Sequence, residues 1–327
     1  MNCSAPDTNG TGIWSSQVVL ALGIPQVLLN FISLVCNSTV IVAILYERHF
    51  ERPIFILFCS LAASDLLSSF AAMYITLLFM TNPESTIYGS DELLKAYAIF
   101  TIAVLSTIYN LMSIGIERYL SVAECTRMRA RVLKWQIVAA VSGNWGLAVL
   151  FGCLPLAGWN CLHKGHSSNL YSPFCTDYLA FITIPNCMVA FVCLLVTYFK
   201  IIFILKKQKT AIAAHDLAFK NTYKTAEMQV TRTSISIWIL TAVSYVPFFA
   251  GVLWDSFNHS CREELHTGVY IFRNITAVMF TVNAIGILKM LREGSDGQLA
   301  PSGPADTKGV QNGNCSYWCL SAEQPFG

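Results

Sequence analysis

The stretch from Pro53 to Met80 reads PIFILFCSLAASDLLSSFAAMYITLLFM, and Asp65 is its single charged residue. A segment of about 20 mostly apolar residues is long enough to cross the hydrocarbon core of a bilayer. Backbone N–H and C=O groups find no water to bond with at that depth, so a lone crossing segment must be helical. The stretch therefore predicts a transmembrane helix with one acidic side chain near its middle.

Six further segments of this kind occur along the 327-residue chain. The predicted set of seven spans covers residues 17–46, 53–80, 95–122, 135–157, 178–206, 229–255 and 267–291. The last span is the weakest, because it includes Arg273. Hydrophobic residues make up 54% of the chain and charged residues 12%, with a mean hydropathy of +0.53. This composition excludes a disordered protein, a typical soluble enzyme and a nucleic-acid binder, and we expect an all-α bundle of seven transmembrane helices.

The basic residues predict how this bundle is oriented. All but four of the 21 Lys and Arg residues lie on one side of the predicted bundle. Cytoplasmic segments carry the excess of positive charge in membrane proteins, so we expect an extracellular N-terminus and a cytoplasmic C-terminus. Residues 1–16 would then be extracellular, with glycosylation sequons at Asn2 and Asn9. Residues 17–291 would form the membrane domain, and residues 292–327 a cytoplasmic tail without ordered structure.

Polar side chains within the spans are the first candidates for function, because ionisable groups at membrane depth are costly. Asp65 lies in the middle of the second span. Three interpretations stand open for this carboxyl group: it is held neutral by its neighbours, it forms a buried cation site, or it is a switch that changes protonation. Asn37 in the first span and Asn283 in the seventh are expected to share the same polar centre.

The sequence Glu117-Arg118-Tyr119 ends the third span at its predicted cytoplasmic face. One interpretation is an ordinary helix end whose Arg reaches out to water. The alternative is a clasp, because Glu227 at the start of the sixth span offers Arg118 a second carboxylate. A guanidinium shared between two carboxylates has two arrangements and suits a conformational switch. Tyr198, toward the same end of the fifth span, could reach this place.

These residues resemble a known family when they are taken together with Trp145 in the fourth span and Pro247 in the sixth. The matching features are Asn37, Leu61-Ala62-x-x-Asp65, Glu117-Arg118-Tyr119, Trp145, Tyr198 and Pro247. Their order and their placement on the spans are similar to those of the rhodopsin-like (class A) G-protein-coupled receptors, from residue 17 to about 290.

The resemblance implies a multi-pass receptor of the plasma membrane that activates heterotrimeric G proteins. It implies no enzyme activity, cofactor or metal site, and the sequence carries no His-Glu-x-x-His or Gly-x-Ser-x-Gly motif. The residues that would form the activation switch are Glu117, Arg118, Tyr119, Glu227, Tyr198, Tyr245 and Pro247.

One loop narrows the resemblance to a branch of the family. The run Gly158-Trp159-Asn160-Cys161 looks like the lysophospholipid and cannabinoid receptor group, in which the second outer loop closes a disulfide on itself. The resemblance pairs Cys161 with Cys175. The Glu-Arg-Tyr sequence is closer to the lysophospholipid receptors than to the cannabinoid receptors, which resemble Asp-Arg-Tyr. The expected ligand is therefore a lipid mediator similar to a lysophospholipid.

The expected ligand site departs from that group. Receptors for lysophosphatidic acid and sphingosine 1-phosphate hold the phosphate with an Arg followed by Glu or Gln, and Ala96 and Tyr97 stand at the matching positions. Lys95 and Arg273 are the substitutes that we expect to hold an anionic head group. The alternative is internal: Arg273 pairs with Asp91 or Glu92, and Lys95 reaches water. The other expected ligand contacts are Tyr97, Phe100, Val104, Phe248, Phe249, Val252 and Tyr270.

Two departures concern signalling. Helix six normally carries Cys-Trp-x-Pro in this family, and here the sequence is Ser244-Tyr245-Val246-Pro247. Helix seven normally carries Asn-Pro-x-x-Tyr, and here Asn283 is followed by Ala284 and then by Ile287 in place of the tyrosine. Alternative functions are accordingly an orphan, constitutively active or decoy receptor of the family, or a seven-span transporter. The sequence leaves open the ligand, the class of G protein and the oligomeric state.

Overall fold

The computed structural model describes residues 15–46, 53–127, 133–162, 168, 170–212, 236, 239–255 and 267–299. This described part of the chain is almost entirely helical, with seven long helices. The predicted all-α bundle is thereby confirmed. The sequons at Asn2 and Asn9, and Glu227 of the predicted clasp, lie outside the described residues.

Each long helix overlaps one predicted span. Their bounds are α1 (Ser16–Tyr46), α2 (Pro53–Thr81), α4 (Asp91–Arg127), α5 (Lys134–Gly152), α7 (Ile184–Ile212), an unlabelled helix Ile239–Asp255, and α9 (Thr267–Leu299). Three short pieces join them: α3 (Pro83–Tyr88), α6 (Thr176–Tyr178) and the π-helical turn η2 (Leu179–Thr183).

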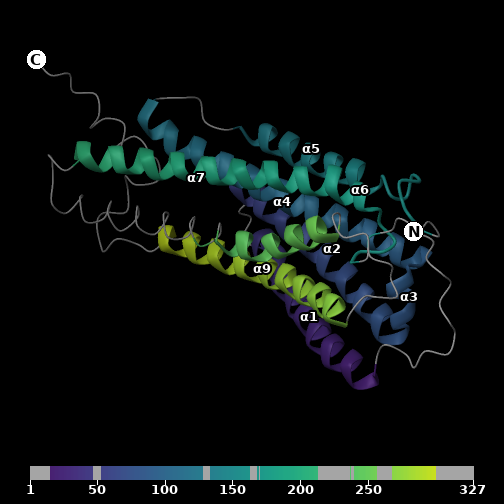
Figure 1. The fold of residues 1–327 in the computed structure, drawn as a ribbon. Helices are drawn as coiled ribbons and strands as arrows, with labels where there is room; N and C mark the ends of the chain where they lie inside the picture. The colour runs from purple at the N-terminus through teal and green to yellow at the C-terminus, as the bar shows by residue number, and fades with distance from the viewer. Residues whose placement is uncertain are drawn as a thin grey trace, which may run out of the picture.

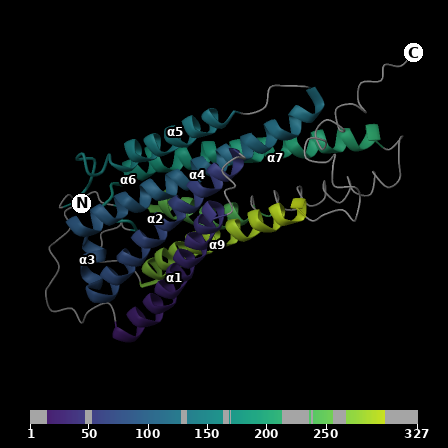
Figure 2. The same cartoon turned by 180° about the vertical axis from the view of Figure 1, so that it is seen from behind.

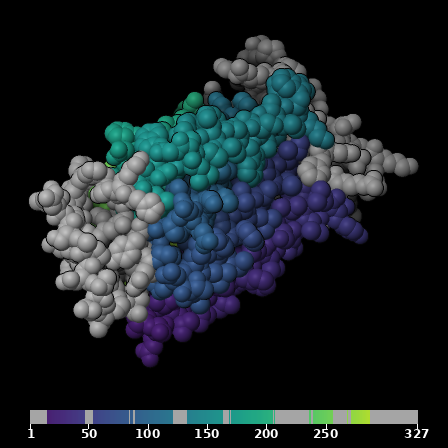
Figure 3. Space-filling model, turned by 90° about the vertical axis from the view of Figure 1, so that its right-hand side faces the viewer, coloured from purple at the N-terminus to yellow at the C-terminus, as the bar shows by residue number. Residues whose placement is uncertain are grey.

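The long helices lie lengthwise in one bundle, in which α1 is tilted relative to α7, as the opposite views in Figures 1 and 2 show. Helix α1 packs against α2 and α9, while α4 packs against α2, α5 and α7. In α4, 61% of the most apolar window is buried inside the protein, against 28% in α1 and 22% in α5. Helix α4 is therefore the central element, and α1 and α5 lie at the periphery. Figure 3 shows α1, in purple, at the edge of one face of the molecule.

Five of the helices, α1, α2, α4, α5 and α7 with its preceding turns, are long and apolar enough to cross a membrane. The other two contribute shorter apolar stretches, Ile239–Asp255 and Ile271–Gly286. Large apolar side chains point outward on the peripheral helices, for example Leu28, Phe31 and Val35 on α1, which are half exposed or more. Such a large apolar surface is unfavourable in water and indicates contact with the acyl chains of a bilayer.

Buried polar side chains tie three helices together at mid-height. Trp145 Nε1 on α5 donates to Ser60 Oγ on α2 at 3.1 Å, and that hydroxyl donates to Asn110 Oδ1 on α4 at 3.1 Å. Asn144 Nδ2 on α5 reaches the same Asn110 Oδ1 at 3.2 Å. Small and polar residues hold membrane helices together in this way, since apolar side chains gain little there from leaving lipid. The Trp145 of the sequence motif thus links α5 to α2.

The bundle has two distinct ends, which we name by their sequence features. The disulfide end carries α3 and the Cys161–Cys175 bridge, which the structure contains as the resemblance implied. The Glu-Arg-Tyr end carries residues 117–119, about 40 Å away from Asp91 along α4 at 1.5 Å per residue. At the disulfide end Gly89 has φ +87, and a Cβ there would lie 2.8 Å from Ser172 Oγ. Gly89 therefore lets the disulfide loop approach the start of α4 closely.

Helix α9 is longer than the sequence suggested. We expected the ordered chain to end at residue 291, whereas the helix continues to Leu299. The glycines at positions 294 and 297 weaken a helix but do not end it. Pro301 disfavours helical geometry in the residue before it, which agrees with the end of the helix at Leu299. The predicted tail without ordered structure thus overlaps this helix at residues 292–299, and its residues 300–327 lie outside the described part of the chain.

Candidate functional site

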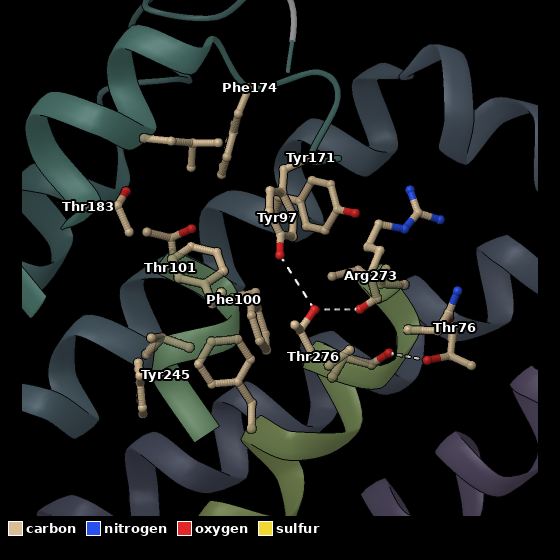
Figure 4. A pocket seen from close by; sticks show the side chains of 18 of the residues that line it. Thr76, Tyr97, Phe100, Thr101, Tyr171, Phe174, Thr183, Tyr245, Arg273 and Thr276 are labelled. Carbon is tan, nitrogen blue, oxygen red and sulfur yellow. Dashed lines mark hydrogen bonds between the residues drawn. The ribbon is translucent and has the colours of Figure 1, made fainter. Parts of the chain in front are cut away.

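A large cavity opens into the bundle near the disulfide end (Figure 4). About 920 Å³ of space lies among its lining atoms, part of which is open to the outside. Side chains from α1, α2, α4, η2, α7, α9, the helix Ile239–Asp255 and the disulfide loop contribute to it. Of the residues proposed from sequence as ligand contacts, five line this cavity: Tyr97, Phe100, Val104, Phe248 and Arg273.

One part of the lining is aromatic and apolar. The ring of Phe280 on α9 lies 6.1 Å from that of Phe100, 4.8 Å from that of Tyr245 and 5.6 Å from that of Phe248, each edge-to-face. Aromatic rings prefer such geometry and bury large apolar areas. This cluster therefore offers a fixed apolar surface with no ionisable group other than the Tyr245 phenol.

The opposite part of the lining is polar. Arg273 on α9 is 8% exposed, and its Nη1 donates to the carbonyl oxygen of Thr86 on α3 at 3.0 Å. The Thr276 hydroxyl donates to the Arg273 carbonyl oxygen at 2.8 Å, so the hydroxyl of Tyr171, 3.4 Å away, is the donor to Thr276 Oγ1. Thr76 and Gln26 complete this side of the cavity. Among the described lining residues, Arg273 is the one with a full charge.

The disulfide loop supplies the cover of the cavity. Tyr171 and Phe174 lie between Cys161 and Cys175, and their rings pack on Phe248 at 5.2 Å and on Tyr97 at 5.6 Å. Burial raises the pKa of the Tyr171 phenol above its usual value, so it stays protonated and able to donate at neutral pH. Ser168 Oγ donates to Asp255 Oδ2 at 2.6 Å, which fastens the loop to the helix Ile239–Asp255.

Of the other four expected ligand contacts, three do not line the cavity. Lys95 is exposed and does not contribute to the cavity, so the structure does not bring it together with Arg273. Val252 is fully buried in the cluster that contains Phe248. Phe249 lines a separate apolar cavity with Ile108 and Cys187. The side chain of Tyr270 lies outside the described residues.

Sequence reasoning missed several lining residues. Tyr171 and Phe174 carry no helical periodicity, because they belong to a loop. Gln26 had a usable signal: Gln26, Asn30, Ser33 and Asn37 recur at helical spacing in an uncharged span, and all four are buried. Polar residues on one face of a membrane helix mark the side that faces protein or a cavity rather than lipid.

Asp65 lies one layer deeper, toward the Glu-Arg-Tyr end. Thr107 Oγ1 donates to Asp65 Oδ1 at 2.8 Å, and Asp65 is 1% exposed. A cavity of about 330 Å³ brings Asp65 together with Asn283. Asn37 is buried and does not line that cavity; its Nδ2 donates to the Ser33 carbonyl oxygen at 2.8 Å. Tyr245 lines this cavity and the large one, so it lies between them.

At the opposite end, Arg118 Nε lies 3.8 Å from Glu117 Oε2. Its guanidinium carbon lies 5.9 Å from the centre of the Phe58 ring, a cation–π contact. Tyr198 is buried in the apolar cluster that includes Phe58, and Tyr119 packs against that cluster. Pro247 lies within the helix Ile239–Asp255, in the same turn as Tyr245. The switch residues within the described part thus occupy two levels of the bundle.

Comparison with known proteins places the chain in a family. Residues 36–285 match the 7 transmembrane receptor (rhodopsin family). The chain belongs to this family, and it is therefore a membrane-embedded receptor rather than an enzyme.

Individual relatives narrow the resemblance. The chain is 27% identical to lysophosphatidic acid receptor 3 of Homo sapiens over 247 residues, which cover 75% of this chain and 67% of that receptor. The same identity and coverage apply to lysophosphatidic acid receptor 3 of Rattus norvegicus. Lysophosphatidic acid receptor 1-B of Xenopus laevis is 28% identical over 243 residues, which cover 74% of this chain and 65% of that receptor. The predicted resemblance to the lysophospholipid receptor group is confirmed.

Proposed function

We propose that this protein is a plasma-membrane receptor that binds an anionic single-chain lipid in the large cavity and activates heterotrimeric G proteins. The observation that carries the proposal is the division of the cavity into an aromatic part around Phe280 and a polar part around Arg273. A ligand that satisfies both parts has an apolar body and one polar end. The similarity to lysophosphatidic acid receptors supports the same class of ligand.

Arg273 is our proposed contact for the head group. A buried guanidinium is costly unless it is hydrogen-bonded or paired, and Arg273 donates to the carbonyl oxygen of Thr86 at 3.0 Å and to its hydroxyl oxygen at 3.5 Å. An anionic group bound beside the guanidinium would form charge-assisted hydrogen bonds with it. Because Lys95 is exposed, we assign the head group to Arg273 together with the neighbouring hydroxyl groups rather than to two cations.

We further propose that the disulfide end faces the extracellular side and the Glu-Arg-Tyr end the cytoplasm. The excess of Lys and Arg near the latter end supports this orientation. Tyr245 separates the lipid cavity from the Asp65 cavity, so a bound lipid can bias the position of the helix Ile239–Asp255. A ligand shifts such an equilibrium only by its difference in affinity for the two states.

The experiment compares dose–response curves for Arg273→Gln, Lys95→Gln and the unchanged receptor in cells. The agonist is 1-oleoyl-glycerol 3-phosphate, and the readout is G-protein activation. We expect Arg273→Gln to lower the potency by about 100-fold, since hydrogen bonds between charged groups contribute about 1.5–3 kcal/mol. Lys95→Gln, an exposed matched control, should leave the potency within about threefold of that of the unchanged receptor.

An N-terminal epitope tag, stained on intact cells, measures the surface amount of each variant and also tests the proposed orientation. Potency of Arg273→Gln equal to that of the Lys95→Gln control would refute the head-group site. Saturable binding of the lipid without any G-protein response would refute the signalling part and favour a decoy receptor.

A further inference from the structure

Gln26 on α1 is a polar residue of the cavity that neither the sequence motifs nor the Arg273 site uses. It is 4% exposed and lines the large cavity. Its Oε1 atom has no hydrogen-bond partner among the residues that the structure describes. A buried amide oxygen left without a partner costs about 1–3 kcal/mol, so such atoms in native proteins have a water molecule or a ligand to bind.

Two of the described lining residues have a buried side-chain oxygen without a partner, Gln26 and Thr183, and Thr183 on η2 lies across the cavity from Arg273 (Figure 4). The Thr76 hydroxyl donates to the Ala72 carbonyl oxygen at 2.7 Å, and the Thr276 hydroxyl donates to the Arg273 carbonyl oxygen at 2.8 Å. Gln26 differs from these two side chains, because it lines the cavity and its buried Oε1 atom has its acceptor capacity unused.

The position of Gln26 relative to Arg273 follows from the packing of α1 on α9. The two helices run in the same direction (Figure 1), and Thr281 Oγ1 donates to Asn30 Oδ1 at 2.8 Å. One turn before this contact, Gln26 is level with Ala277, which also lines the cavity. Arg273 lies one further turn toward the disulfide end, about 6 Å along the axis.

We infer that Gln26 selects lipids that carry a hydroxyl group beside the anionic head group. This inference rests on the proposed function. An anion at Arg273 places the next carbon atoms of the ligand one turn deeper, at the level of Gln26. A hydroxyl group can donate to the amide oxygen or accept from the amide nitrogen, so it fits either orientation of the side-chain amide. The ligand class is therefore a hydroxylated single-chain lipid anion, of which a monoacylglycerol phosphate is one example.

The selection arises from the cost of an unpaired group. A site built to hydrogen-bond a hydroxyl group rejects an analogue that lacks it, because the buried amide then stays unsatisfied. Removal of the amide should abolish this preference, since neither lipid then leaves a protein group unpaired. Loss of Arg273 should lower the potency of both lipids by the same factor.

The test uses two probes, 1-oleoyl-glycerol 3-phosphate and its analogue with the middle hydroxyl group replaced by hydrogen. Their potencies are compared on the unchanged full-length receptor, on Gln26→Met and on Thr39→Val. Methionine has nearly the volume of glutamine, and Thr39→Val removes an exposed α1 hydroxyl outside the cavity that is already bonded inside its own helix. The readout is G-protein activation, normalised to surface staining.

We expect the hydroxylated probe to be about tenfold more potent on the unchanged receptor and on Thr39→Val. On Gln26→Met the two probes should become equal. Equal potencies on the unchanged receptor would overturn the inference and leave the proposed function intact, and so would a preference that Gln26→Met retains. A receptor that responds to neither probe would overturn the proposed function and this inference together.

Discussion

Arg118 is the single residue that we propose holds the resting state at the Glu-Arg-Tyr end. Its guanidinium pairs with Glu117 at 3.8 Å and lies over the Phe58 ring, and both contacts hold it against the bundle. The pair is partly exposed, with 34% of the Arg118 side chain and 13% of the Glu117 side chain accessible. Solvent weakens such a pair to about 1 kcal/mol at most, which is enough to bias a conformational equilibrium without locking it.

Replacement of Glu117 by Gln should therefore raise signalling in the absence of ligand. Without the carboxylate, Arg118 leaves its resting position more readily, and the receptor visits the active state more often. We expect basal G-protein activation to rise by up to about fivefold. Glu92→Gln, the same substitution at an exposed position of the disulfide end, serves as the control and should leave the basal output unchanged. A Glu117→Gln receptor with the basal output of that control would count against the switch.

The residues of the cavity show where prediction from sequence stopped. Lys95 and Tyr97 were both expected to contact ligand, yet the first is exposed and the second buried. Residues at i and i+2 of a helix do not face the same side, so one cavity could not take both. The rotation of α4 about its axis decides which residue faces the cavity, and packing against α2, α5 and α7 sets that rotation.

At the scale of elements, the disulfide loop covers the cavity and is held in place by a covalent bridge. The Cys161–Cys175 bridge restrains the segment that carries Tyr171 and Phe174. A bridge that closes a loop of about 15 residues stabilises a protein by about 3 kcal/mol, chiefly by restricting the unfolded chain. Without it, the two aromatic residues would have to be ordered by packing alone.

The double variant Cys161→Ser/Cys175→Ser should consequently melt at a lower temperature and respond to the lipid with lower potency. Purified receptor in detergent gives the Tm, and the cellular dose–response curve gives the potency. Cys153→Ser is the matched control, because Cys153 is a free cysteine that follows α5. A double variant with the Tm and potency of this control would show that the loop holds its shape without the bridge.

The elements themselves were largely predictable, and the physical reason is the bilayer. Apolar length and the absence of charge defined the seven spans, each of which overlaps a helix in the structure. The short helix α3 was missed although a signal was present: Asn82 precedes Pro83, and its Oδ1 accepts from the Ser85 N–H at 3.1 Å. The π-helical turn η2, which places Leu179 and Thr183 in the cavity wall, has no such local signature.

On the scale of the whole molecule, Tyr245 lies where three cavities of the bundle meet. It lines the large cavity, the Asp65 cavity and the apolar cavity near Phe249. The family normally has tryptophan at this position, and the smaller ring of tyrosine keeps an aromatic contact with Phe280 at 4.8 Å. We propose that a lipid that displaces this pair acts on the helix Ile239–Asp255 and, through it, on the Glu-Arg-Tyr end.

The most direct test of the central claim is nucleotide exchange with purified components. The full-length receptor is reconstituted in lipid nanodiscs with a panel of heterotrimeric G proteins, and GTP uptake is followed as 1-oleoyl-glycerol 3-phosphate is added. Our account predicts saturable acceleration of exchange by at least one G protein, with Arg273→Gln shifted to higher lipid concentration. Exchange rates that stay unchanged by the lipid for every G protein in the panel would contradict it.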